Sequence, residues 1–397
     1  LSALNAFYAL GTLASNGDAN SYHLPRAYYW LQLGTVRHFS TSDFRLVEFP
    51  PNPSFVYAWL MALGGGGAFP LPQATAGLAL ALAVAGLARA TGAGRRAATF
   101  SGLVPLTFPL LILEMGSPQT DVLAAATGAA SIFFGLRAVR SDSRSDRVGF
   151  GLAFGVALGT KLTLFFLLPG LALALLVAAF AEDRALAPRR LARAGGAALA
   201  GFLALGAYNY ALNLADLGNP IASGRARAVA LGGRSVPELA TRTTNFLRYG
   251  YQILDWPGLA RGEGSLLPRL QRRAFEAIAR AAGTDLTRGV AFGPVAKSRW
   301  LPDEDRSGFG PAGFGVVMVA LILAFVTWRR FRRGGRREAL TAVLLVGIGL
   351  SWLAGFVLLN QAWTPQKIRC FLTFVPLRCA PVLPVVYELA LLRVPAM

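Results

Sequence analysis

The chain has 397 residues, of which 54% are apolar and only 15% are charged, and its mean hydropathy is +0.48. A soluble domain usually carries about 25% charged residues, so this composition excludes the ordinary soluble class. The net charge is +19, but the arginines gather between apolar runs, as the positive-inside rule predicts for a membrane protein. This pattern argues against a nucleic-acid partner, which a basic soluble chain would first suggest.

Apolar runs of the length that crosses a bilayer recur along the chain. The sequence therefore predicts an all-α, polytopic transmembrane helical bundle of about ten spans. The chain is expected to be truncated at both ends, because its first apolar run is short and its last ends abruptly. The runs lie at 1–14, 71–88, 98–113, 120–138, 148–160, 162–180, 195–213, 311–328, 339–360 and 371–392.

Basic residues give the expected orientation of this bundle. If the spans alternate in direction, seventeen arginines fall in the loops of one side, against six basic residues in the shorter loops of the other. Positively charged loops stay in the cytoplasm, so the loops at about 15–70 and 214–310 are expected outside the inner (plasma) membrane. The predicted organisation is an N-terminal module at 1–213, the large loop, and C-terminal helices at 311–397.

The first outer loop is expected to contain two amphipathic helices that lie on the membrane surface. Pro25 can start a helix, because its missing N–H is not needed at the first position, and residues 26–33 would continue it. The apolar segment 54–64 is too short to cross, and is predicted to place Tyr57 and Trp59 at the headgroup level. If this segment did cross, the preceding loop would be cytoplasmic instead.

The same loop holds the densest group of polar residues, in GDANSYHLPRAYYWLQLG at 17–34. Asp18 at the membrane edge suits a general base, and Arg26 suits a phosphate at headgroup depth. Tyr22 and His23 lie between them and are predicted to contact substrate. The alternative interpretation of this stretch is an aromatic belt with a helix cap.

Two further acids are candidates for the same site. Glu48 precedes a proline pair, which restricts the backbone beside it and would hold the carboxylate rigidly; a turn into the next helix is the alternative. Asp121 closes the turn EMGSPQTD. It is either an ordinary acid at a helix N-terminus, favoured by the dipole, or part of a polar site together with Gln119 and Thr120.

The candidate cations lie near the same expected face. Lys161 interrupts the apolar stretch 148–180, where a charge is costly and indicates function; we expect it at the outer end of a short helical hairpin, facing a phosphate. Snorkelling to the interface is the alternative. Lys367 and Arg369 open the last span and either meet the same phosphate or anchor a helix end. The acidic run at 303–305 is interpreted as a solvated loop.

These stretches resemble a known family. DANSYHLPRAYYW, EFPP, SPQTD and GTK, in this order and spacing, are similar to motifs of bacterial GT-C membrane glycosyltransferases, among them the dolichyl-phosphate-mannose protein mannosyltransferase-like and aminoarabinose transferase-like enzymes. The resemblance covers about residues 1–220 and 300–380. It implies transfer of a sugar from a polyprenyl-phosphate carrier to a glycan, lipid or protein acceptor on the non-cytoplasmic face. The first helix is shorter than in the family and the C-terminal end stops earlier, so the acceptor is not implied.

The resemblance also implies roles for single residues. Asp18 matches the acid that activates or positions the acceptor, and Glu48 and Asp121 match acids that line the sugar pocket. Lys161 and Arg369 match cations that bind the carrier phosphate. Direct displacement of that phosphate would invert the anomeric centre.

No cofactor is expected. Some GT-C enzymes use a divalent metal, but the scattered carboxylates do not indicate one, and two histidines (His23 and His38) make a histidine-based site improbable. Cys370 and Cys379 are too few for a disulfide framework and are expected to be free.

A transporter or lipid flippase is the alternative function. It would place charges at the bilayer midplane and show paired repeats with broken helices, whereas the candidate residues are expected at the outer edge. A scaffold subunit of an envelope-assembly complex is a third possibility, and would tolerate changes at the acidic positions.

Overall fold

The computed structural model describes residues 16–221, 223–224, 226, 239–254, 266–287, 307–318, 336–359 and 364–391. Within these ranges the chain forms helices and no strands, which confirms the predicted all-α class. The helices are η1 (Ala19–His23), α2 (Leu24–Leu33), α3 (Arg45–Glu48), α4 (Asn52–Ala62), η2 (Gly66–Ala68), α5 (Leu71–Ala90), α6 (Arg95–Leu103), η3 (Val104–Thr107), α7 (Pro109–Met115), α8 (Asp121–Ser141), α9 (Arg144–Thr160), η4 (Leu162–Leu167), α10 (Leu168–Glu182), α11 (Ala187–Leu205), α12 (Tyr208–Leu217), α14 (Leu239–Ile253), α15 (Leu266–Ala281), α17 (Arg336–Leu359), η5 (Pro365–Thr373) and α18 (Val375–Leu391).

Several of these helices can cross a membrane. Among the described residues, four are long and apolar enough, and the number rises to seven if each of three bent pairs counts as one span. The chain is thus a multi-pass membrane protein, as predicted. The count of about ten spans stays a prediction, because the run at 1–14 and much of the run at 311–328 lie outside the described residues.

Three of the predicted spans are not single straight helices. The run at 98–113 bends by 74° between η3 and α7, the run at 195–213 by 65° between α11 and α12, and the run at 371–392 begins at a 50° bend between η5 and α18. Pro105 and Pro109 lack the N–H that would continue the first of these helices. An apolar run shows that a segment prefers lipid or core, but does not show where its backbone turns.

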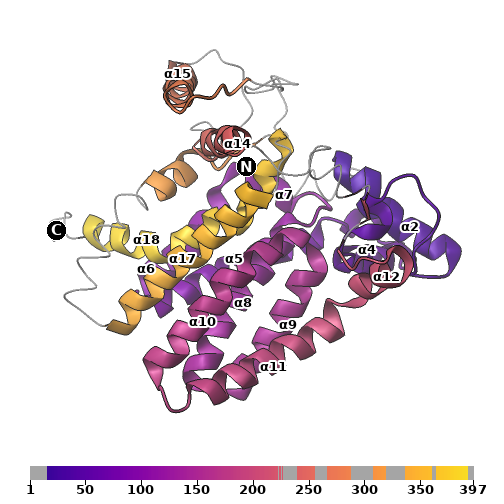
Figure 1. Ribbon diagram of the computed structural model, residues 1–397, viewed down its shortest axis with the longest axis horizontal. Helices are drawn as coiled ribbons and strands as arrows, with labels where there is room; N and C mark the ends of the chain where they lie inside the picture. Colours follow the sequence, from indigo (N-terminus) through magenta and orange to yellow (C-terminus); the bar gives the residue numbers. More distant parts are fainter. Residues whose placement is uncertain are drawn as a thin grey trace.

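Small residues allow the central helices to pack closely. Gly151 and Gly155 of α9 face Gly201 of α11 so closely that an added Cβ at any of them would overlap the backbone of the other helix. Because lipid tails are as apolar as leucine, close backbone approach rather than hydrophobic burial favours such contacts in membranes. Figure 1 shows the resulting bundle, in which α8 to α11 run alongside α5 and α17.

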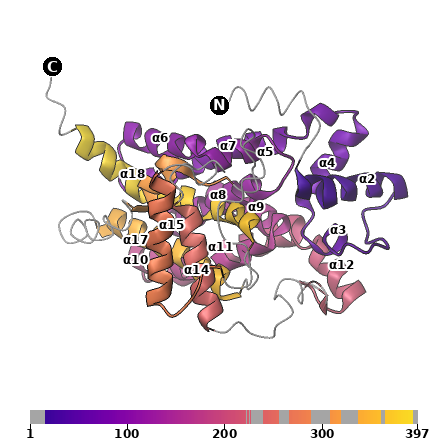
Figure 2. The same ribbon diagram turned by 90° about the horizontal axis from the view of Figure 1, so that it is seen from above.

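Two groups of helices lie outside this bundle. The helices α2, α3, α4 and α12 gather at one side of it, and α14 and α15 lie across one end (Figures 1 and 2). The predicted start of a helix at Pro25 is confirmed, since α2 has this proline in its first turn and ends at Gly34 in a left-handed conformation. These peripheral helices bring the first loop against the ends of α8 and α9.

The helix at 54–64 is also present, as α4, but one of its expected contacts is wrong. Trp59 is 73% exposed, as a residue at the membrane interface would be, whereas Tyr57 is completely buried. The Tyr57 hydroxyl donates a hydrogen bond of 2.8 Å to the carbonyl of Gln119. Tyr57 therefore fixes the turn before α8 and does not face lipid headgroups.

Candidate active site

Asp18 is held at the start of η1 and meets two arginines. The side chain of Asn16 accepts a hydrogen bond of 2.8 Å from the Asp18 N–H, which fixes the backbone there. The Asp18 carboxylate lies 2.6 Å from Arg369 and 3.5 Å from Arg45, and accepts a hydrogen bond of 3.4 Å from Tyr22. Asp18 thus joins the first loop to the last helical segment, although 351 positions separate it from Arg369.

Asp121 and Lys161 form a second ion pair beside it. Asp121 is the first residue of α8, where the helix dipole favours an acid, and Lys161 follows the last residue of α9 in an extended conformation. Their carboxylate oxygen and Nζ are 2.5 Å apart, and their side chains are 3% and 22% exposed. Both interpretations of Asp121 from the sequence therefore apply, since it begins a helix and also holds a cation.

Arg369 is the most connected member of the group. It lies in η5 with its side chain 9% exposed, donates a hydrogen bond to the Gln119 side chain, and is 3.9 Å from the carboxylate of Glu114. The Gln119 carbonyl in turn accepts hydrogen bonds from Tyr57 and Gln73. The turn between α7 and α8 is thereby tied to α4, α5 and η5.

We call these residues the carboxylate–cation cluster. It consists of three acids and three bases that come from the first loop, α7, α8, the end of α9, and η5. Because buried charges are stable only when they are paired, the two sets hold one another in place. The members are Asp18, Arg45, Glu114, Asp121, Lys161 and Arg369.

The side chains of Tyr22 and His23 lie beside the cluster, and the pKa values of both are shifted. Burial, together with the positive charges of Arg26 and Lys161, holds the pKa of His23 well below its ordinary value. Burial and the nearby Asp18 carboxylate raise the pKa of Tyr22 above its usual range. Both side chains are therefore neutral near pH 7 and act as hydrogen-bonding or packing groups there.

Arg26 has a different place from the one predicted. It is 1% exposed, and its guanidinium donates to the carbonyls of Leu46 at 2.7 Å and Phe49 at 2.9 Å, as well as to that of Arg45. Three backbone acceptors thus occupy the group that was predicted to bind phosphate. The phosphate role of Arg26 is therefore corrected to a structural one, in which it folds the segment 45–49 around itself.

Glu48 lies at the edge of the site. It is 4% exposed, and its carboxylate accepts a hydrogen bond of 2.8 Å from the Ser223 N–H. Its carbonyl accepts bonds from Asn209 at 2.8 Å and Asn213 at 3.0 Å, both on α12. Glu48 is held rigidly, as the proline pair predicts, but none of its described bonds reaches a cation of the cluster. Its place in a sugar pocket stays a prediction.

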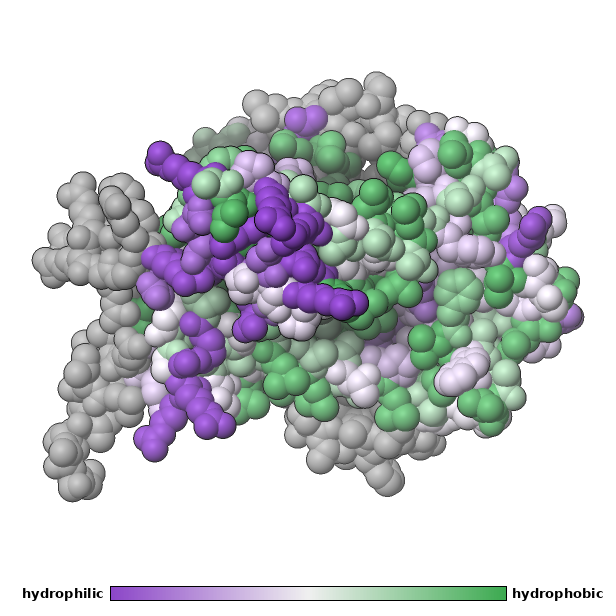
Figure 3. Space-filling model, turned by 90° about the horizontal axis from the view of Figure 1, so that it is seen from below, coloured by the Kyte–Doolittle hydropathy of each residue, from purple (hydrophilic) through white to green (hydrophobic). Residues whose placement is uncertain are grey.

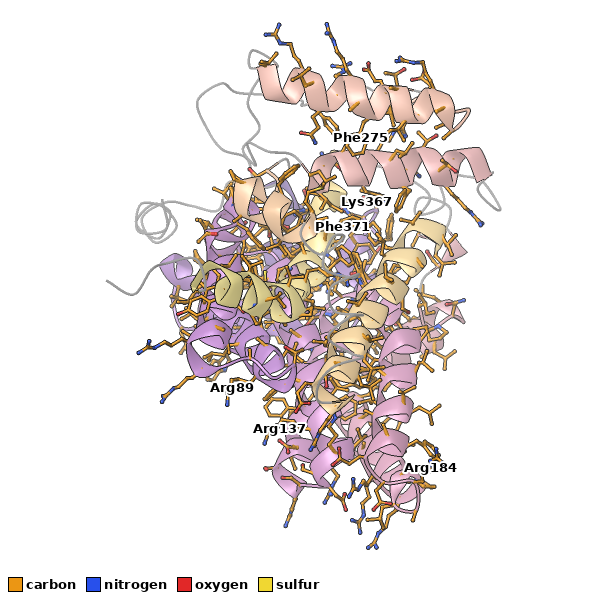
Figure 4. All side chains as sticks on the ribbon, turned by 90° about the vertical axis from the view of Figure 1, so that its left-hand side faces the viewer. Arg89, Arg137, Arg184, Phe275, Lys367 and Phe371 are labelled. Carbon is orange, nitrogen blue, oxygen red and sulfur yellow. The ribbon has the colours of Figure 1, made fainter. Side chains whose placement is uncertain are left out.

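Lys367 precedes Arg369 in η5 and is half-buried. Its N–H donates a hydrogen bond of 3.1 Å to the carbonyl of Thr364. Figure 4 shows Lys367 at the end of the bundle beneath α14 and α15, with Phe371 beside it. Phe371 packs against Trp352 and Phe356 of α17, at ring-centroid distances of 5.3 and 5.1 Å, and so anchors η5.

Some members of the cluster were not predicted from the sequence. Arg45 was not among the predicted site residues, and neither was Gln73, which lies outside the cluster but binds the Gln119 carbonyl. Glu114 carried a usable signal, because a carboxylate in the apolar helix PLLILEM is costly in a membrane unless it is paired. It is completely buried.

The possible metal-binding groups and the two cysteines were the remaining candidates for a functional site. Within the described residues there is no group of three or more His, Cys, Asp or Glu side chains placed to hold a metal ion. Cys370 and Cys379 are free, as predicted. Whether the reaction needs a metal stays a prediction.

Comparisons with known proteins support the resemblance seen in the sequence. Residues 48–207 match the sequence model of the family described as dolichyl-phosphate-mannose-protein mannosyltransferase. This segment contains Glu48, Asp121 and Lys161, and ends before the loop that follows α12. No curated protein sequence matches the chain.

Two solved structures have a similar fold. ArnT from Cupriavidus metallidurans in the apo state is 18% identical with a TM-score of 0.54, and covers 99% of this chain and 58% of its own. ArnT from the same organism bound to undecaprenyl phosphate is 16% identical with a TM-score of 0.56, and the coverage is 99% and 59%. The predicted GT-C fold is confirmed. The chain spans about three fifths of the length of these structures.

Proposed function

We propose that this protein is an integral membrane glycosyltransferase that transfers a sugar from a polyprenyl-phosphate carrier to an acceptor on the non-cytoplasmic side. The observation that carries the proposal is the carboxylate–cation cluster, in which segments far apart in sequence bring acids and bases together at one end of a membrane bundle. The match of residues 48–207 to a mannosyltransferase family supports it. A similar fold in a protein bound to undecaprenyl phosphate supports the choice of carrier.

The cations of the cluster suit a phosphate ester. Lys161 and Arg369 approach the same region from two different segments, and Arg45 lies beside Asp18. A sugar phosphate leaves more easily when its developing negative charge is neutralised by preorganised donors. We assign Lys161 and Arg369 to this task, with Arg45 as a further donor for either the phosphate or Asp18.

Asp18 is the best candidate for the general base. Its side chain is 28% exposed, whereas that of Asp121 is 3% exposed and that of Glu114 is fully buried. Among the three acids of the cluster, Asp18 is therefore the one placed to meet an acceptor hydroxyl. The equally exposed Asp43 is held by Arg45 at 2.7 Å and does not contact Arg369 in any described bond. Asp121 acts as a positioning residue, because it holds Lys161, and Glu114 supports Arg369 in the same way. Direct attack by the acceptor would invert the anomeric centre.

Substrate binding would also prepare the base. Asp43 also pairs with Arg45, at 2.7 Å, so four carboxylates already surround the three cations and an arriving phosphate has to compete for them. Arg369 can turn from Asp18 to the phosphate, because Asp18 is the most exposed of its partners. The departure of Arg369 would leave the Asp18 carboxylate open to accept a hydrogen bond from the acceptor hydroxyl.

The broken helices do not favour the transporter alternative by themselves. Bends occur at three spans of the described residues, and such breaks were expected of a transporter. In a transporter, however, the charged site would lie between the broken helices near the bilayer midplane. Here Asp121 and Lys161 lie where helices begin or end, although Glu114 and Arg369 belong to two of the bent pairs. The bends therefore do not separate the two functions, and the transfer assay does.

The test is transfer from synthetic polyprenyl-phosphate sugars by the full chain in lipid, with crude envelope as the acceptor. Asp18→Asn is expected to lower turnover by about 10²–10⁴-fold, the usual contribution of a general base. Asp216→Asn is the matched control, because this aspartate is also in an outer segment but pairs with His38, away from the cluster. Equal turnover in wild type and Asp18→Asn would remove Asp18 from the chemistry. No turnover with any donor by the folded wild type would favour a transporter.

A further inference from the structure

A cavity opens at the other end of the bundle, away from the carboxylate–cation cluster. Its volume is about 640 Å³, and it lies between α5, α8 and α17. Four arginines and one acid line it, namely Arg89, Arg137, Arg140, Arg337 and Glu338. Figure 4 places Arg89 and Arg137 at the end of the molecule opposite Lys367. We call this cavity the arginine pocket.

The helix α17 closes the pocket only loosely. The Arg140 guanidinium donates a hydrogen bond of 2.7 Å to the Thr341 hydroxyl and so links α8 to α17. Beside it, Glu338 lies against Gly92, where an added Cβ would come within 3.0 Å of the glutamate side chain. Thr341 and Gly92 do not line the pocket, but their contacts help to fix two side chains that do, Arg140 and Glu338.

The guanidinium groups keep donors available. Each has several N–H groups in a planar fork, yet among the described residues each makes one hydrogen bond or ion pair. Arg89 donates to a backbone carbonyl and Arg140 to a hydroxyl, both neutral. Arg137 and Arg337 each pair with one carboxylate, at 2.8 and 3.1 Å, and are 55% and 58% exposed. The remaining donors are free to bind an anion.

The charges in the pocket are unbalanced. Four guanidinium groups and one carboxylate line the cavity, and Asp146 and Glu182 outside the lining pair with Arg137 and Arg337. Four positive charges thus meet three carboxylates, and an anion would balance the remaining charge. Planar, forked donors match the oxygens of a phosphate better than a point charge does, and the cavity volume falls in the range of roughly 300–1,000 Å³ that is usual for small-ligand sites.

The wall of the pocket also has an apolar part. Phe133 lines it together with Gly86, where an added Cβ would meet the phenyl ring at 2.7 Å. Arg137 lies over the same ring, 5.4 Å from its centroid. A ligand with a phosphate and an adjoining apolar portion would therefore find both kinds of surface.

The setting favours a phospholipid as the source of the phosphate. Figure 3 shows a hydrophilic patch on this end of the molecule beside apolar surface, as expected where a bundle leaves the hydrocarbon. Basic pockets between transmembrane helices on the cytoplasmic side bind anionic headgroups, and the arginine-rich loops of this chain are expected on that side. We propose that the arginine pocket binds the phosphate group of an anionic phospholipid of the inner leaflet.

Lipid binding by the full chain in a mild detergent tests this proposal. The purified protein is titrated with phosphatidylglycerol or phosphatidylcholine, and bound lipid is counted by native mass spectrometry. Wild type is expected to bind phosphatidylglycerol more tightly. Since a basic residue near an anionic lipid surface contributes about fivefold in affinity, Arg89→Gln with Arg337→Gln should weaken binding by roughly twentyfold.

Two controls separate the pocket from general surface charge. Arg184→Gln removes an exposed arginine at the same end of the molecule that does not line the pocket (Figure 4), and is expected to leave binding unchanged. Glu338→Gln keeps every arginine and removes the one lining carboxylate, so it should tighten binding. The second change keeps the test decisive even if the double variant folds poorly.

The outcomes are distinct from those of the transfer assay, since they report lipid binding and not turnover. Equal binding of both lipids by wild type would overturn the proposal. So would an Arg184→Gln effect as large as that of the double variant, or weaker binding by Glu338→Gln. Displacement of phosphatidylglycerol by inorganic phosphate at similar concentration would keep the phosphate site but overturn the lipid as its source.

Discussion

Both ends of the helical bundle carry several basic residues, but their surroundings differ. In the carboxylate–cation cluster, Arg369 is 9% exposed and meets two acids and a glutamine. In the arginine pocket, Arg137 and Arg337 are more than half exposed, and each meets one acid. One end buries Arg369 among its partners, and the other leaves the guanidinium groups of its ion pairs more than half exposed.

The difference follows from the cost of removing charge from water. A buried ion persists only with partners, and removing one partner leaves an uncompensated charge. Exposed ion pairs are screened and contribute little to stability. Arginines that serve only to orient a membrane protein can stay hydrated, as the exposed Arg184 does. Burying the charges of the cluster costs free energy that stability alone does not require the protein to spend. Such costly buried charges are typical of a catalytic site.

The largest expected effect on stability comes from breaking the buried pair at the cluster. Asp121→Asn leaves the Lys161 ammonium without the carboxylate 2.5 Å away. We expect a loss of about 3–5 kcal/mol in the free energy of unfolding, measured by denaturation in detergent. Adding Lys161→Met should recover part of the stability but no transfer activity. A single variant as stable as wild type would contradict the account of this pair.

Arg26 lies at the same end as the cluster but belongs to the scaffold. Arg26→Gln leaves all three of its carbonyl acceptors without a charged donor. We expect a loss of about 2–3 kcal/mol in stability, and a loss of activity in proportion to unfolding. Arg26→Lys should be affected too, because an ammonium cannot reproduce the fork. If Arg26→Gln lost carrier binding but kept the stability of wild type, Arg26 would be a phosphate-binding residue after all.

His23 should make stability depend on pH. Its pKa in the folded protein is well below the value of 6.5 expected in the unfolded chain, so the unfolded state takes up the proton first as the pH falls. Stability should therefore decrease below about pH 6.5, by up to about 1.4 kcal/mol per pH unit. His23→Gln should flatten this part of the curve. A curve unchanged by His23→Gln would contradict the burial of the imidazole.

The smallest effect is expected at the arginine-rich end. Arg193 pairs with Asp142 at 2.5 Å, is 39% exposed, and shares this acid with Arg147. Arg193→Gln should lower stability by less than about 1 kcal/mol. The loss of stability in Asp121→Asn should be measured under the same conditions. The comparison tests whether burial explains why ion pairs at the two ends differ in their contribution to stability. A loss as large as that of Asp121→Asn would abolish the distinction.

Much of this arrangement is predictable from the sequence. The apolar runs give the membrane class and most helices, and Pro25 marks the start of α2. A lysine within an apolar run and acids at loop edges indicate a site, because isolated charges are costly there. Asp18, Asp121, Lys161 and Arg369 were each candidates for this reason, and the structure brings them together.

The rest depends on contacts that no local pattern contains. Whether Arg26 binds a phosphate or backbone carbonyls is decided by the path of residues 45–49, which carries no sequence signal. The bends in three apolar runs depend on how neighbouring helices pack. The contact of Arg369 with Glu114 joins residues in different helices, and only the fold shows that one neutralises the other.

Binding of undecaprenyl phosphate to the full chain tests the central claim most directly, because it asks which end of the bundle holds the carrier. We predict that Arg369→Gln and Lys161→Gln each weaken binding by about tenfold or more, since each removes a desolvated charge from the phosphate. With phosphatidylglycerol in excess to occupy the arginine pocket, Arg337→Gln should change the affinity by less than about twofold, because Arg337 lines that pocket and not the carboxylate–cation cluster. Unchanged binding in folded Arg369→Gln and Lys161→Gln proteins, or an equal loss in Arg337→Gln, would contradict the assignment of the carboxylate–cation cluster as the carrier site.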